Sequence, residues 1–176
     1  SPKEINWIEF DFFDEDIEEH IDDIYKKPIW PKKPLFYVCC PSKTDIEVAP
    51  IDKENIFILI PIAPGIEDTS DIRKKYYDIV LDRLSNYCQI DLKQIIEYER
   101  SYCINDFISD YNAFKGNAYG LANTLTQTAN LKPKIKSKKL NNLFYTGQLT
   151  VPGPGVPPSL ISGKVVANYI LNKELC

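Results

Sequence analysis

Three stretches of the chain show the apolar patterning of β-strands. Residues 35–40 and 55–62 are almost continuous apolar runs bounded by proline or polar residues, which predicts two buried strands. Residues 95–104 alternate between apolar and polar side chains, which predicts a third strand. The sequence contains no visible internal repeat.

Helical spacing falls between and after these strands. From residue 72 to residue 84 apolar side chains recur every four positions, and residues 69–71 can each cap the start of the helix that this spacing predicts. A second, short helix is predicted from Asn105 or Asp106 to Tyr111. The order strand, strand, helix, strand predicts an α+β fold with an antiparallel sheet.

The pattern changes after residue 131. A short apolar run predicts a strand over residues 142–146, a Gly/Pro loop follows over 147–157, and a helix is predicted over 158–173. One side of that helix is apolar, which predicts that it packs on a sheet. The apolar side consists of Ile161, Val165, Val166, Tyr169 and Ile170.

Charge and hydropathy narrow the class of protein. Lys plus Arg total 21 against 25 Asp plus Glu, and this net charge of −4 argues against a general nucleic-acid binder. The longest apolar run, over residues 56–66, contains two prolines and is too short to cross a membrane, so we expect a soluble or at most peripheral protein. Residues 132–139 include five lysines, which predicts either a solvated loop, the favoured reading, or a contact with anionic lipid.

Few residues offer metal or acid–base chemistry. The single histidine, His20, lies in an acidic stretch where isoleucines 17, 21 and 24 predict the apolar face of a short helix, so we expect a solvated histidine. The acidic residues lack the spacing of a calcium loop. The five cysteines form no C-x-x-C pair and are read as small core residues in a reducing compartment, so no metal site is expected.

The Gly/Pro loop is the candidate binding segment. A strand, a glycine turn and a helix N-terminus together favour phosphate or a polarised ring, because the first N–H groups of a helix lack partners and its dipole is positive there. Gly153 and Gly155 do not continue into a dinucleotide fingerprint, and a rigid structural turn is the alternative. Gly163, inside the helix, predicts the close approach of another backbone or a ligand.

Residues 106–121, 125–129, 142–147 and 152–157 resemble the carboxy-terminal portion of bacterial-type phytoene desaturases and related carotenoid desaturases, within the flavin-dependent amine-oxidase-like superfamily. Residues 36–45 and 54–64 look like strands of the same family's substrate domain. The sequence departs from the commoner motif at Gln148, Leu149, Thr150 and Pro154, where small residues are usual.

The resemblance implies a division of the chain and a cofactor. Residues 1–130 would be the carboxy-terminal part of a substrate-binding domain, and 131–176 the strand, loop and helix that return to a Rossmann-type FAD-binding domain, α/β in the parent enzyme. The family implies FAD as the cofactor. The residues that it places at FAD are Gly147, Gln148, Leu149, Gly155, Val156, Pro157 and Leu160.

The resemblance also implies the reaction and its partners. The substrate would be a carotenoid or other long polyene, dehydrogenated by hydride transfer to flavin, with Phe36, Val38, Phe57 and Leu59 either lining its tunnel or packing as plain core. No catalytic residue is assigned, since Glu99 and Arg100 are candidates only as charged residues within a predicted strand. The missing amino-terminal portion of the same enzyme would be a partner. The protein would be cytoplasmic or peripheral on the cytoplasmic membrane.

Two other functions stay open. One is a different flavin oxidoreductase of the superfamily, such as a hydroxycarotenoid 3,4-desaturase. The other is a stand-alone lipid-binding or partner-binding module, which predicts that the chain folds cooperatively by itself. A fragment of an enzyme, in contrast, predicts exposed apolar surface and aggregation when the rest of the enzyme is absent.

Overall fold

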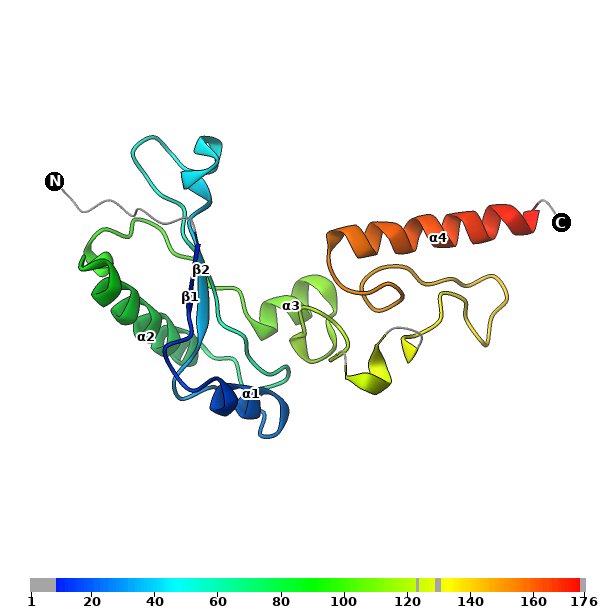
Figure 1. The fold of residues 1–176 in the computed structure, drawn as a ribbon, viewed down its shortest axis with the longest axis horizontal. Helices are drawn as coiled ribbons and strands as arrows, with labels where there is room; N and C mark the ends of the chain where they lie inside the picture. Colours follow the sequence, from blue (N-terminus) through cyan, green and yellow to red (C-terminus); the bar gives the residue numbers. More distant parts are fainter. Residues whose placement is uncertain (1–8, 123, 129–130, 175–176) are drawn as a thin grey trace. The chain divides into compact units, whose positions relative to one another are not determined.

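The computed structural model describes residues 9–122, 124–128 and 131–174. The chain forms two compact units, Ser1–Gly116 and Asn117–Cys176, and each is described by itself. The domain boundary that the resemblance placed at residue 130 stays a prediction. Figure 1 shows the strands and helices α1 to α3 in the first unit and α4 in the second.

The first unit is built on a three-stranded antiparallel sheet in the order β1 (Glu9–Phe12), β2 (Phe36–Cys39) and β3 (Phe57–Leu59). The expected antiparallel sheet with helices is confirmed, and β2 and β3 lie where the apolar runs predicted strands. The strand β1 was not predicted. The strand predicted over 95–104 is wrong, because Leu92–Gln94 form a short 3-10 turn and the segment that follows stays irregular.

One face of this sheet carries the core. Phe12 pairs with Phe36 across β1 and β2, and their rings stack with centroids 4.5 Å apart. The long helix α2 (Ser70–Cys88) packs its buried residues against this face. Figure 1 shows α2 running beside the sheet. The buried cluster consists of Phe12, Phe36, Val38, Val80, Leu81, Leu84 and Leu92.

The predicted helix caps are confirmed in part. The Thr69 hydroxyl accepts the Ile72 N–H at 3.3 Å and caps α2. The next helix, α3 (Ile104–Tyr111), begins before the expected Asn105, because the Asp106 carboxylate accepts the Cys103 N–H at 2.8 Å and closes the first turn.

The histidine expected to be solvated is buried, and that prediction is wrong. In α1 (Ile17–Tyr25) His20 is only 4% exposed, whereas Ile21 is 45% exposed. His20 Nδ1 accepts the Leu35 N–H at 2.9 Å, and Nε2 lies 2.8 Å from the Pro61 carbonyl. Hydrogen bonds to two other segments therefore turn the polar histidine inward.

The second unit contains one long helix, α4 (Val156–Glu174). The strand predicted over 142–146 is reduced to an isolated bridge between Lys136 and Phe144. Val166 is buried on α4, but Ile161 and Val165 are exposed. The predicted apolar face is therefore wrong in part, and within the described residues of this unit α4 has no sheet to pack on.

Candidate functional site

The Gly147 peptide unit lies at the start of the Gly/Pro loop and is held from both sides. Its N–H donates to Ser162 Oγ at 2.7 Å, and Ser162 Oγ donates onward to the Ser159 carbonyl at 2.7 Å. Its carbonyl accepts from Thr150 N at 3.2 Å and from Thr150 Oγ1 at 3.0 Å. Because both polar groups are already bonded, Gly147 offers a ligand its bare Cα and not an N–H.

Glycine is required at this turn by its backbone angle. Gly147 has φ of +97°, where L side chains are strained. A Cβ built on it meets no described atom within 4 Å, so open space lies beside the Cα. Gly155, which precedes α4, has φ of +107°.

The start of α4 has fewer donors than a typical helix. The Ser159 N–H bonds the Gly155 carbonyl at 3.0 Å. Pro157 and Pro158 have no N–H to offer. Among the first-turn residues the structure therefore leaves the Val156 N–H as the donor without a described partner, at the positive end of the helix dipole.

The residues expected at FAD all belong to this loop and helix start. Leu149, Val156, Pro157 and Leu160 are exposed, with Leu160 71% exposed. Gly147 and Gln148 are half-buried. The exposed apolar side chains leave a surface on this unit that an aromatic ring can cover.

The four residues expected to line a substrate tunnel do not share a face. Val38 pairs with Ile58, and Phe36 and Val38 point into the core beneath α2. Phe57 and Leu59 pair with Cys39 and Tyr37, so their side chains point to the opposite, open face. Phe57 is 51% exposed.

Glu99 and Arg100 lie in an exposed irregular segment, not in the predicted strand. The Arg100 guanidinium stands 5.9 Å from the Tyr102 ring centroid. The pKa of the Tyr77 hydroxyl is raised to about 12, mainly by burial and secondly by a hydrogen bond to Glu99. These surface contacts give neither residue a catalytic partner among the described residues.

Three buried polar residues of the second unit were missed by sequence reasoning. Ser162 and Thr150 are 0% and 2% exposed, and Lys132 is 6% exposed. A Cβ on Gly153 would lie 3.4 Å from Lys132 Cε, so the lysine stem fills the space beside this glycine. The expected solvated loop is thus wrong for Lys132. The glycines at 147 and 153 were the available signal, because each has a positive φ that other residues rarely adopt.

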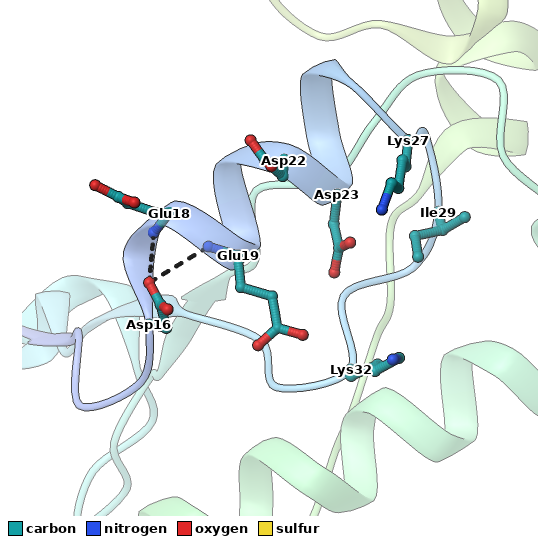
Figure 2. A pocket seen from close by; sticks show the side chains of 8 residues that line it. All are labelled: Asp16, Glu18, Glu19, Asp22, Asp23, Lys27, Ile29 and Lys32. Carbon is teal, nitrogen blue, oxygen red and sulfur yellow. Dashed lines mark hydrogen bonds between the residues drawn. The ribbon is translucent and has the colours of Figure 1, made fainter.

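A hollow beside α1 has charged walls, and Figure 2 shows it from close by. The Asp16 carboxylate accepts the N–H groups of Glu18 and Glu19, which caps the helix. An apolar polyene does not suit this lining, and no cluster of metal-ligating side chains occurs in the part of the chain that the structure describes. The lining residues are Asp16, Glu18, Glu19, Asp22, Asp23, Lys27, Ile29 and Lys32.

Over residues 9–122, 124–128 and 131–174, no helix is both long and apolar enough to cross a bilayer.

Comparison with known proteins identifies the family. A carotenoid 3,4-desaturase of Haloarcula japonica is 45% identical over 156 residues, which cover 89% of this chain and 32% of that protein. A 4,4'-diapophytoene desaturase of Staphylococcus haemolyticus is 33% identical, covering 90% and 33%. A zeta-carotene-forming phytoene desaturase of Myxococcus xanthus is 30% identical, covering 90% and 31%. No protein-family model matches the chain.

These relatives extend over most of the chain, so the similarity includes both units. The chain spans about a third of the length of the curated relatives it matches. The resemblance drawn from the sequence motifs is thereby confirmed: the chain belongs to the carotenoid desaturase family and corresponds to a carboxy-terminal portion of its members.

Proposed function

We propose that the chain is the carboxy-terminal part of an FAD-dependent carotenoid desaturase, which removes a hydride and a proton from adjacent carbons of a long polyene. The similarity to three desaturases over about nine tenths of the chain carries the proposal. Its partner would be the amino-terminal portion of the same enzyme, which would supply the rest of the FAD site and of the substrate domain.

The second unit has features that suit FAD. When bound, FAD supplies the hydride acceptor. Gly147 would let the cofactor approach its bare Cα, and Leu149 and Leu160 would lie against apolar parts of the ring. The Val156 N–H and the positive end of α4 would stabilise negative charge on the flavin edge that faces them. Residues 131–176 would then be the segment that returns to the FAD-binding domain.

The role of the Val156 N–H can be tested with two substitutions that both remove the valine side chain and differ in the backbone donor. Proline is accommodated at the first helical position, so Val156→Pro deletes this donor while keeping the helix. Val156→Ala keeps the donor and is the matched control. In the full-length enzyme we expect Val156→Pro to lower the flavin reduction potential and Val156→Ala to leave it near the parent value. Equal potentials in the two variants would contradict the role of this donor.

The open face of the sheet suits a hydrocarbon substrate. Phe57 and Leu59 present apolar surface beside Tyr37 on that face, whereas Phe36 and Val38 already serve the core. Phe57 and Leu59 are therefore the proposed substrate contacts. Phe57→Ala should raise the KM for the polyene by a larger factor than it raises the Kd for FAD.

The reaction itself is tested by product analysis. The full-length protein, loaded with FAD, is incubated with phytoene in lipid vesicles, and the products are separated by chromatography. Desaturation lengthens the conjugated system, so the products should absorb at longer wavelength than phytoene. A purified protein that binds no FAD and changes no carotenoid would overturn the proposal. The isolated chain should bind FAD poorly, since most of the site would lie outside it.

A 3,4-desaturase is the second candidate function. The sequence identity to a relative with this name supports it. The Haloarcula japonica carotenoid 3,4-desaturase is 45% identical, against 30% and 33% for the two phytoene-type relatives. A hydroxycarotenoid with a saturated 3,4 bond is therefore the second substrate in the assay. Conversion of this compound with no conversion of phytoene would select the 3,4-desaturase.

The lysine-rich stretch suits a contact with the membrane that would hold such substrates. Lys134, Lys138 and Lys139 are exposed, so their charges are accessible to anionic lipid. Sedimentation with phosphatidylglycerol vesicles should decrease as salt rises, and equal sedimentation with neutral vesicles would contradict this contact.

A further inference from the structure

The shape of the Gly147 turn is not fixed by packing. Glycine loses more conformational freedom on folding than any other residue, and Gly147 has open space where a Cβ would stand. Its left-handed angle of +97° must therefore be maintained by hydrogen bonds. Those bonds come from Thr150, three positions later within the loop, and from Ser162 in α4.

The two hydroxyls are fully engaged within the protein. Ser162 Oγ accepts from the Gly147 N–H and donates to the Ser159 carbonyl, each at 2.7 Å, and the residue is completely buried. Thr150 Oγ1 donates to the Gly147 carbonyl at 3.0 Å, and Thr150 is 2% exposed. Neither hydroxyl is placed to contact a ligand directly, so any effect on a ligand must pass through Gly147.

We infer that Thr150 and Ser162 are positioning residues that hold the Gly147 peptide from opposite sides and so preform the turn that meets FAD. This inference rests on the proposed function. A loop already held in its bound shape loses less entropy when the ligand arrives, and the ligand binds more tightly. Ser162 additionally ties the loop to α4, so the turn and the start of that helix move as one piece.

The size of the effect follows from the bonds that are lost. A buried hydrogen bond makes a modest net contribution to stability, and leaving its partner unpaired costs more than the bond contributes. Each hydroxyl deletion is therefore expected to raise the Kd for FAD about tenfold, equivalent to about 1.4 kcal/mol. Because both hydroxyls bond the backbone of one residue, the double variant should lose less than the product of the two single losses.

The experiment uses the full-length enzyme, four single variants and the double variant that combines Thr150→Val with Ser162→Ala. Thr150→Val keeps the shape of the side chain and removes its hydroxyl, and Ser162→Ala removes a single oxygen. Thr150→Ser keeps the hydroxyl and should bind FAD as the parent does. Thr146→Val is the matched control, since Thr146 is exposed and immediately precedes Gly147. The Kd for FAD is measured by flavin fluorescence, together with the Tm of the apoprotein and kcat at saturating FAD.

We expect Thr150→Val and Ser162→Ala to weaken FAD binding about tenfold while kcat at saturating FAD stays near the parent value, as befits groups that act through the turn. Thr150→Ser and Thr146→Val should bind within about twofold of the parent. If Thr150→Val and Ser162→Ala bind FAD as tightly as Thr146→Val, or lose only apoprotein Tm, the positioning role is wrong. A parent enzyme that binds no FAD would instead refute the proposed function.

Discussion

Replacement of His20 by alanine tests the inward orientation of α1. The imidazole joins α1 to two other segments, through the Leu35 N–H at 2.9 Å and the Pro61 carbonyl at 2.8 Å. Since Nδ1 accepts from Leu35, the proton lies on Nε2, which donates to Pro61. The alanine variant loses both hydrogen bonds and leaves the buried Leu35 N–H without its partner.

The expected loss is about 3 kcal/mol in the free energy of unfolding. The two hydrogen bonds account for about 1 kcal/mol each, and the unpaired N–H adds about 1 kcal/mol or more. His20→Asn places an acceptor near the position of Nδ1 and should recover part of the loss, because it again satisfies Leu35. Urea unfolding followed by tryptophan fluorescence measures this loss, because the ring centroid of Trp30 lies 4.5 Å from that of Tyr76 in the same unit.

Ile21→Ala is the matched control on the same helix. Ile21 is 45% exposed, so its truncation should change stability by about 0.5 kcal/mol or less. The spacing of the isoleucines predicts the reverse order, with Ile21 on the buried face. A larger loss for Ile21→Ala than for His20→Ala would refute the orientation of α1 described above.

Four further perturbations each test one residue. The Arg73 guanidinium, bonded to Asp68 at 2.6 and 2.7 Å, holds the pKa of the Asp68 carboxyl below its usual value. This stability is present above the unfolded pKa of about 3.9 and is lost as pH falls through the lower folded pKa, so Asp68→Asn should flatten the acid limb of a Tm-against-pH curve. Gly116→Ala should destabilise by about 2 kcal/mol in urea unfolding, because Gly116 has φ of +66° and a Cβ would lie 2.5 Å from the Ile104 carbonyl. Gly163→Ala, in α4 with no described atom near its Cβ, should instead stabilise by up to about 1 kcal/mol, and a loss there would show a close neighbour. Leu84→Ala, fully buried in the α2 core, should cost about 3 kcal/mol by the same measurement.

The amphipathic pattern located α2 and its Thr69 cap correctly, since both depend on residues close together in the chain. It failed over 95–104, where alternation without a neighbouring strand gave no sheet. An alternating pattern describes which side chains are apolar, but strand pairing needs a partner from a distant segment.

The sequence likewise predicted only part of the candidate site. The sequence located the Gly/Pro loop and the start of α4, because glycine and proline restrict the backbone locally. It did not show that Pro157 and Pro158 leave few donors there, nor that the Gly147 peptide is already bonded on both sides. The hydroxyls that bond it come from Thr150 and Ser162, and the spatial approach of Ser162 to Gly147 spans 15 positions in the chain.

By itself, the sequence determined the family, the long helices and the loop expected to meet the cofactor. Local conformational preferences and motif spacing are sufficient for these. Only the tertiary structure decided which faces are buried. It turned His20 inward and Ile21 outward, and it separated Phe36 from Phe57 across the sheet. The reason is that burial depends on which distant groups pack against a segment or satisfy its hydrogen bonds, and the local pattern of side chains does not specify those partners.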